Sequence, residues 1–107
     1  MKLGFSKEKK SLSLVIHPSE INDTINFLEY LKNGNEGENF LISEVTRKMS
    51  SHVDPDKDLL LNIYGRYINF SIRFVSSYIH MYKAMGGEVS TVEKILVQME
   101  ESVMAVN

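Results

Sequence analysis

The chain has 107 residues, of which 43% are hydrophobic and 24% are charged, and its formal net charge is −2. This composition predicts one small globular domain, or a domain with an appendage, and argues against disorder. The absence of cysteine excludes disulfides and thiolate metal sites and fits a cytoplasmic location. No apolar stretch is long enough to cross a membrane, so we expect neither secretion nor membrane insertion.

Charge is distributed unevenly along the chain. Residues 1–17 contain four lysines and one glutamate, whereas residues 18–58 contain four basic and nine acidic side chains. Residues 59–86 contain three basic and no acidic side chains, and residues 87–107 contain one lysine and four glutamates. The basic N-terminal block is therefore the part of the sequence that is most suited to attract a polyanion.

The first predicted element is a strand over residues 11–17. One side of this strand carries Leu12, Leu14 and Ile16, and the opposite side carries Ser11, Ser13 and Val15. This period of two predicts a strand with one buried side. Pro18 cannot continue a strand ladder and suits the first turn of a helix.

Four helices are predicted after this strand. The first covers residues 19–32 and ends at Asn33-Gly34; the second begins with Asn39 as its cap and extends to about Met49. Asp54 and Pro55 predict the start of a third helix, which continues to Gly86. A fourth helix begins at Ser90, and the predicted elements do not indicate an internal repeat.

The third helix carries a narrow polar stripe that stays in register over three heptads, which favours a helix of about thirty residues. In an alternative interpretation, residues 68–74 form a strand, because apolar and polar residues alternate there. Such a long helix would protrude from a small domain and expose apolar surface, so we expect self-association into a dimer or tetramer. The expected oligomer interface consists of Leu12, Leu14, Ile16, Tyr67, Phe70, Phe74 and Tyr78.

The order strand, proline-marked turn, helix, glycine-containing turn and helix over residues 9–51 resembles the ribbon-helix-helix DNA-binding family. The resemblance implies that two copies pair their strands into a ribbon, whose outward side chains enter the major groove of double-stranded DNA. By this resemblance Ser11, Ser13 and Val15 face the bases, and Lys7, Lys9 and Lys10 attract the DNA backbone. The amide end of the second helix, near Asn39, would meet a phosphate.

These observations predict a mainly α fold, with a short N-terminal strand followed by four helices. Residues 1–53 would form the strand-helix-helix unit, and residues 54–107 would form a helical extension used for oligomerisation. Such an extension resembles relaxosome accessory proteins of conjugative and mobilisable plasmids.

The sequence contains no catalytic signature. His17, His52 and His80 are too scattered for a metal motif, and residues 54–58 begin like a calcium loop but Leu59 replaces the glycine that such a loop needs. We therefore expect no enzymatic activity, no cofactor and no metal.

Two functions stay open. One is a small oligomeric DNA-binding regulatory or accessory protein. The other is a helical protein–protein interaction module, such as an adaptor, chaperone or inhibitor, in which the strand pairs with a hairpin partner built from residues 2–6 or with another protein's sheet edge.

Overall fold

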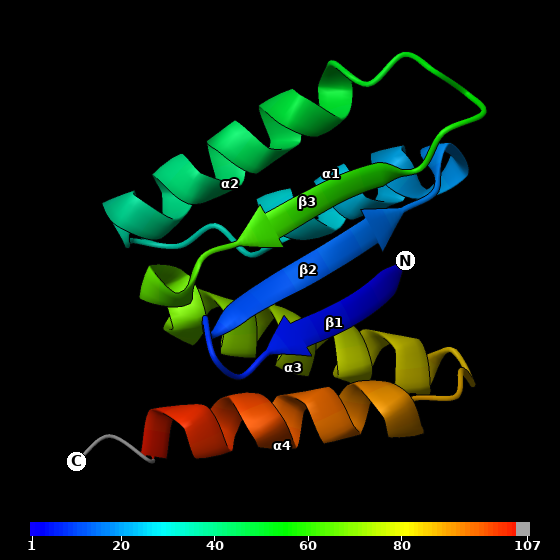
Figure 1. The fold of residues 1–107 in the computed structure, drawn as a ribbon. Helices are drawn as coiled ribbons and strands as arrows, with labels where there is room; N and C mark the ends of the chain where they lie inside the picture. Colours follow the sequence, from blue (N-terminus) through cyan, green and yellow to red (C-terminus); the bar gives the residue numbers. More distant parts are fainter. Residues whose placement is uncertain (105–107) are drawn as a thin grey trace. The chain divides into compact units, whose positions relative to one another are not determined.

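The computed structural model describes residues 1–104. Its elements in chain order are β1 (Lys2–Ser6), β2 (Ser11–Ile16), η1 (Pro18–Glu20), α1 (Ile21–Tyr30), α2 (Glu36–Ser50), β3 (Leu59–Ile63), η2 (Gly65–Tyr67), α3 (Ile68–Ala84) and α4 (Ser90–Met104), where η denotes a 3₁₀ helix. The three strands form one sheet in the order β1-β2-β3, and neighbouring strands run in opposite directions (Figure 1). The predicted mainly α fold with four α-helices is confirmed, but the prediction of a single strand is wrong.

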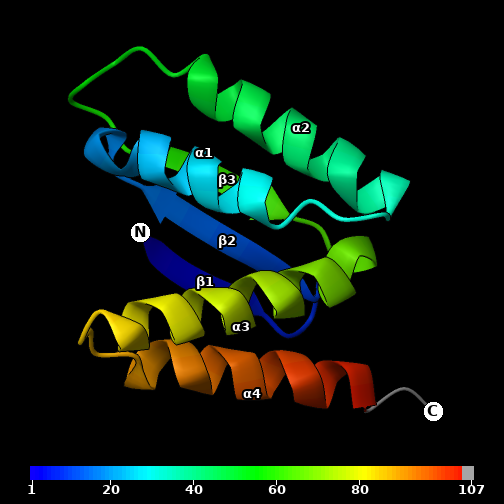
Figure 2. The same cartoon turned by 180° about the vertical axis from the view of Figure 1, so that it is seen from behind.

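The chain forms two compact units. The first unit contains residues 1–2 and 14–61, and the second contains residues 3–13 and the chain from Asn62 onward. Helices α1 and α2 lie side by side in the first unit, and α3 and α4 lie side by side in the second (Figure 2). Strands β2 and β3 each contribute residues to both units.

The two halves of the chain repeat the same order of elements. The series β2, η1, α1, α2 is followed by β3, η2, α3, α4, and the 3₁₀ helices and the helices after them begin 47 residues apart. Seven of the twenty residues from Leu12 to Leu31 recur unchanged 47 positions later; in the first half they are Leu12, Leu14, Ile16, Ile21, Asn22, Ile25 and Phe27. The chain therefore contains an internal repeat, and the expectation of none is wrong.

The repeats differ mainly in the length of their first helix. Helix α1 has 10 residues and α3 has 17, whereas α2 and α4 both have 15. The seven additional residues of α3 correspond to about two turns at 3.6 residues per turn, so the extra segment keeps its apolar face in line. Hereafter residues 11–50 are called the first repeat and residues 59–104 the second repeat.

Strand β2 occupies the centre of the sheet. Leu12, Leu14 and Ile16 are each 0% exposed, which confirms the buried side that the alternation predicts. Their own chain covers these side chains, since they are fully buried in the single molecule, and both edges of β2 pair with strands of the same molecule. The prediction that a second copy covers them is wrong. Strand β2 pairs with residues 2–6, which form β1; this hairpin was expected in the alternative function as a protein–protein interaction module.

Residues 54–67 do not form the predicted start of a long helix. The carboxylate of Asp54 accepts a hydrogen bond from the Asp56 N–H at 2.9 Å and closes a turn instead. Residues 59–63 then form β3, because its ladder with β2 satisfies the hydrogen-bonding groups of their backbone. The side chains of Leu61 and Ile63 are buried. Residues 54–107, which were predicted to form a helical extension, therefore contain a strand as well as helices.

Helix α3 starts at Ile68, which confirms a helix over residues 68–74 and excludes the alternative strand. Phe70 and Phe74 are buried inside the single chain, so the prediction that they form an oligomer interface is wrong as well. Tyr67 and Tyr78 are half-buried, and their part in an interface stays a prediction.

Helix α2 begins four residues earlier than predicted. Its cap is Asn35, whose side-chain oxygen accepts a hydrogen bond from the Glu38 N–H at 3.0 Å. Asn39 lies inside the helix and bonds the backbone of Asn33: its oxygen accepts from the Asn33 N–H at 3.1 Å, and its nitrogen donates to the Asn33 carbonyl at 2.5 Å. The prediction that Asn39 caps this helix is therefore wrong, because its side chain fixes the preceding loop.

Thr24 and Ser71 occupy equivalent positions in the two repeats and give a matched test of hydroxyl pairing. Thr24 Oγ1 donates to the Glu20 carbonyl at 2.8 Å, whereas the buried Ser71 Oγ has no hydrogen-bond partner within the described part of the chain. Thr24→Ala should lower the free energy of unfolding by about 1–2 kcal/mol. Ser71→Ala should leave it unchanged or raise it by up to about 1 kcal/mol, because an unpaired buried hydroxyl is lost. Urea denaturation followed by circular dichroism measures both; equal losses would contradict the structure.

Glu20 makes the stability of the first unit dependent on pH. Partial burial acts to raise the pKa of this carboxyl, but the α-amino group of Met1 and the His17 N–H, 3.0 Å away, outweigh burial and lower the pKa. A carboxyl with a lowered folded-state pKa stabilises the fold above about pH 4.5, and this contribution disappears as the pH falls through the folded-state pKa. Because the group is partly exposed, Glu20→Gln should cost about 1 kcal/mol or less at pH 7. The free energies of unfolding of the two proteins should converge as the pH falls below 4.5 and through the lowered folded-state pKa of Glu20; a difference that stays constant with pH would contradict this origin.

Candidate functional site

The turn between β1 and β2 presents lysine side chains to solvent. Lys7 and Lys9 are exposed, and the Lys9 N–H donates to Ser6 Oγ at 3.2 Å, which holds the turn at its start. Lys10 has a φ of 54°, in the left-handed region. A residue with a Cβ pays about 1–2 kcal/mol in this conformation, and glycine or asparagine is the usual occupant. The chain thus keeps a lysine where its backbone is strained.

A second segment of the same unit packs against this turn. A Cβ added at Gly65 would lie 2.5 Å from the Lys9 carbonyl oxygen and 3.1 Å from the Lys10 Cβ. Only glycine allows η2 to approach the turn so closely. The contact therefore holds Tyr64 and Arg66, which flank Gly65, beside the lysines, although more than fifty residues separate them in sequence.

Arg66 is oriented by two aromatic rings. Its guanidinium lies 5.1 Å from the centroid of the Tyr67 ring and 5.9 Å from that of Tyr64. Such cation–π contacts contribute about 0.5–1 kcal/mol each at exposed sites. Tyr64 is 62% exposed, so its ring remains available for a further contact. We call Lys7, Lys9, Lys10 and Arg66 the basic cluster; Glu8 is the one acidic residue of the turn.

The face of β2 opposite Leu12, Leu14 and Ile16 is only partly buried. Ser13 Oγ donates to the Gly4 carbonyl at 3.2 Å. A Cβ added at Gly4 would lie 2.7 Å from Ser13 Oγ, so the two residues share one face of the sheet. By the period of two, Ser11 and Val15 lie on this face, and all three β2 side chains are half-buried. In β3, Leu60 is 70% exposed and Asn62 is exposed, while Leu61 and Ile63 are buried. We call the exposed or half-buried side of each strand its outward side.

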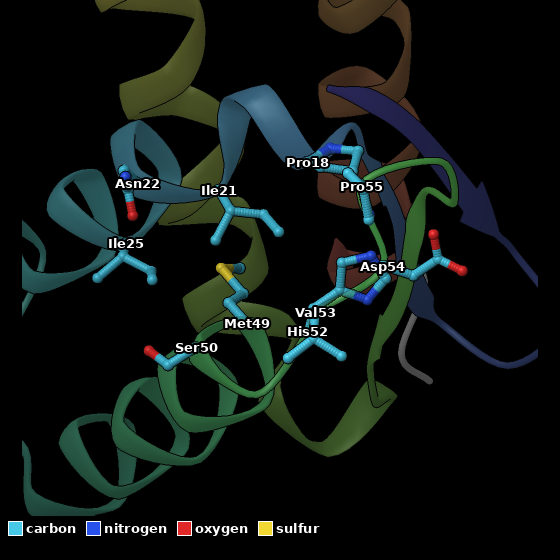
Figure 3. Close-up of a pocket in the computed structure, with 10 residues that line it drawn as sticks. All are labelled: Pro18, Ile21, Asn22, Ile25, Met49, Ser50, His52, Val53, Asp54 and Pro55. Carbon is cyan, nitrogen blue, oxygen red and sulfur yellow. The ribbon is translucent and has the colours of Figure 1, made fainter.

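The first unit contains an open pocket of about 390 Å³ (Figure 3). Six apolar residues and four polar residues line it; the apolar ones are Pro18, Ile21, Ile25, Met49, Val53 and Pro55, and the polar ones are Asn22, Ser50, His52 and Asp54. Two of its polar side chains already have partners: His52 Nε2 donates to the Lys57 carbonyl at 2.7 Å, and the Asp54 carboxylate accepts from Asp56. Because backbone groups of the same loop already engage His52 and Asp54, we place the candidate site at the basic cluster instead.

Metal ligation is not indicated by the side-chain arrangement. Within residues 1–104, no three His, Cys, Asp or Glu side chains group in a way that could hold a metal ion. In the same range, no helix has the length and apolar character needed to cross a membrane.

The structure brings together only some of the site residues that the sequence predicts. Lys7, Lys9, Lys10, Ser11 and Ser13 lie in one unit, around the hairpin between β1 and β2. Val15 shares their strand face, but Asn39 belongs to the other unit and is bound to a loop backbone.

Sequence reasoning missed Tyr64, Arg66 and Asn62, because it placed them on a continuous helix. The signal that could have revealed them is Gly65, which would cost about 1 kcal/mol in a helix and indicates a close backbone approach.

Comparisons of the chain with profiles of known protein families, with curated proteins and with solved structures found no match.

Replacing Gly65 tests whether its contact with the turn is as tight as the structure indicates. Gly65→Ala should lower the free energy of unfolding by about 2 kcal/mol, because the added Cβ meets a backbone carbonyl that cannot move independently. Gly34→Ala is the matched control, since nothing lies within 4 Å of its added Cβ. Chemical denaturation measures both variants; equal stability of Gly65→Ala and the unmodified chain would contradict the contact.

Proposed function

We propose that this chain binds double-stranded DNA through the basic cluster of the second unit, whose cations contact the phosphate backbone. The observation that carries the proposal is the gathering of Lys7, Lys9, Lys10 and Arg66 by the contact of Gly65 with the Lys9 carbonyl. Phosphate contacts supply most of the affinity of proteins for DNA, and they position the protein without selecting a sequence.

The internal repeat supports a ribbon-helix-helix-like module made by one chain. In that family two copies each contribute a strand followed by two helices. Here each repeat has that order, and β2 and β3 are neighbours in one sheet. We therefore propose that the second copy implied by the resemblance is the second repeat of the same molecule. Strand β1 widens the sheet; on its outward side Gly4 and Ser6 are small, and Lys2 adds an exposed cation.

The strained conformation of Lys10 also supports a functional turn. A glycine at this position would relieve the backbone, yet the chain has a lysine with a φ of 54°. Strain of about 1–2 kcal/mol is a large fraction of the stability of a small domain. The need for a positive charge that faces a phosphate explains why this position has a lysine and not a glycine.

Phosphate contact at the first turn of α2, which the resemblance implies, is not part of this proposal. Glu36 and Glu38 lie in the first turn of that helix, and Glu93 lies in the first turn of α4. Their carboxylates repel a phosphate more strongly than the half charge of a helix N-terminus attracts it. The basic cluster is thus the part of the described chain best suited to meet the DNA backbone.

Salt titration tests the proposal. Fluorescence anisotropy with a labelled 20-base-pair duplex should give an affinity that falls between 50 and 200 mM salt, with a slope of about −0.9 for each phosphate neutralised. Lys9→Ala and Lys10→Gly should each weaken binding several-fold and reduce the slope by about 0.9. Lys10→Gly is the sharper variant, because it should stabilise the fold while it removes the charge.

Lys94→Ala is the matched control, since Lys94 is an exposed cation of α4 outside the cluster. It should leave both the affinity and the slope unchanged. Absence of duplex binding at 50 mM salt, or equal losses in Lys94→Ala and Lys9→Ala, would refute the proposal. Tighter binding of the separated strands than of the duplex would assign the cluster to single-stranded nucleic acid instead.

A further inference from the structure

We infer that this protein selects duplex DNA that carries an unpaired base, and that this base stacks on the ring of Tyr64. The inference rests on the proposed DNA binding and names the form of DNA that the same site takes. The Tyr64 ring is 62% exposed and belongs to the second unit, as do the cations of the basic cluster. Those cations account for contact with phosphates, but they leave the neighbouring aromatic surface without a role.

The fold depends on the backbone of Tyr64 more than on its ring. The Tyr64 carbonyl accepts a hydrogen bond from the Tyr67 N–H at 2.9 Å, which closes the single turn of η2. The φ of −68° and ψ of 156° at Tyr64 are extended values that any residue adopts. The preceding residue, Ile63, is buried and anchors the segment. Packing therefore does not explain why this position has an aromatic ring.

Two contacts hold the Tyr64 ring beside the cations. A Cβ added at Gly65 would lie 2.5 Å from the Lys9 carbonyl oxygen, so the neighbouring Tyr64 has a fixed place next to the lysine turn. The Arg66 guanidinium lies 5.9 Å from the centroid of the Tyr64 ring. A tyrosine side chain has only two χ angles and loses little entropy when a ligand fixes it. The cluster thus includes a preorganised flat surface next to groups that bind phosphate.

An aromatic ring beside cations is the arrangement with which proteins hold unpaired bases, because the base stacks on the ring while the cations follow the phosphates. In a continuous duplex, neighbouring bases cover both faces of every internal base, so the Tyr64 ring has no base face to contact. A base that leaves the stack exposes a face, and it remains attached to the phosphates that the cluster attracts. An unpaired base within a duplex therefore satisfies the ring and the cations together.

The exposure of the rings favours one unpaired base over a long single strand. Proteins that bind single strands stack successive bases on several rings. Tyr67, the other ring against Arg66, is half-buried, so Tyr64 has the one largely exposed ring within residues 62–67. The four cations of the cluster suit the denser charge of a duplex.

Fluorescence anisotropy with three duplexes of the same sequence, at 50 mM salt, tests the inference. The first duplex is fully paired, the second carries one unpaired adenine at its centre, and the third has an abasic residue in place of that adenine. The second should bind about 5- to 100-fold more tightly than the third, because stacking on one aromatic ring contributes a factor of this size. The abasic duplex keeps every phosphate, so the two differ by the base alone.

Substitutions of Tyr64 assign this ratio of affinities to the ring. Tyr64→Ala should bring the ratio close to one, whereas Tyr64→Phe should keep it, because stacking needs the ring and not its hydroxyl. Tyr30→Ala is the matched control and should leave the ratio unchanged, since Tyr30 is an 82% exposed tyrosine of α1 in the first unit. Each ratio compares two duplexes on one protein, so a change in overall affinity cancels.

Each failure has its own meaning. Equal affinity of the unmodified protein for the unpaired-adenine and abasic duplexes would overturn this inference and leave the proposed DNA binding standing. A ratio that persists in Tyr64→Ala, or that is lost in Tyr30→Ala, would also overturn it, provided that circular dichroism shows the variants folded. Absence of binding to all three duplexes would refute the proposed function itself.

Discussion

Strand β2 forms backbone hydrogen bonds with β1 along one edge and with β3 along the other, and these two ladders determine which side of each strand is buried. Because side chains alternate between the faces of a strand, a shift of one residue would expose Leu12, Leu14 and Ile16 and bury the serines between them. Burial of these three side chains contributes about 2 kcal/mol each, so the register is strongly specified. The outward positions of β2 and the place of the lysine turn follow from that register.

The internal repeat separates what packing requires from what the surface is free to vary. Identical residues recur mainly at buried or half-buried positions of β2 and α1, such as Leu14, Ile16 and Phe27. Thr24 and Ser71 are also equivalent and buried, yet only the first hydroxyl has a described partner. The two repeats therefore share one buried pattern, while their surfaces carry different chemistry.

Part of this fold follows directly from local sequence patterns. The alternation around Leu14 predicted β2 and its buried side, and helical spacing predicted α1 and most of α3. Strand β3 was missed because Leu60 is apolar yet exposed, which hides the alternation of Leu59, Leu61 and Ile63. In addition, Asp54 and Pro55 have the residue types of a helix start, and only pairing with β2 decides against it.

The repeat was missed for a related reason. Its two halves are offset by 47 residues up to the first helix, and by 54 residues at the start of the second, because α3 is longer than α1. The lysines of the candidate site could be predicted from charge alone, but Arg66 and Tyr64 could not. Their place depends on the contact between Gly65 and the Lys9 carbonyl, which joins segments that are distant in sequence.

Local charge, rather than the net charge of −2, governs what the basic cluster attracts. At physiological ionic strength the Debye length is about 8 Å, so acidic side chains farther away are largely screened from a phosphate at the turn. Glu8 is the acidic residue within the turn, and four cations of the cluster exceed it. Arg66 adds a planar group that can bind two phosphate oxygens, while the lysines act as mobile point charges. A small acidic protein can therefore present one basic contact to a polyanion, provided that Gly65 keeps the two segments together.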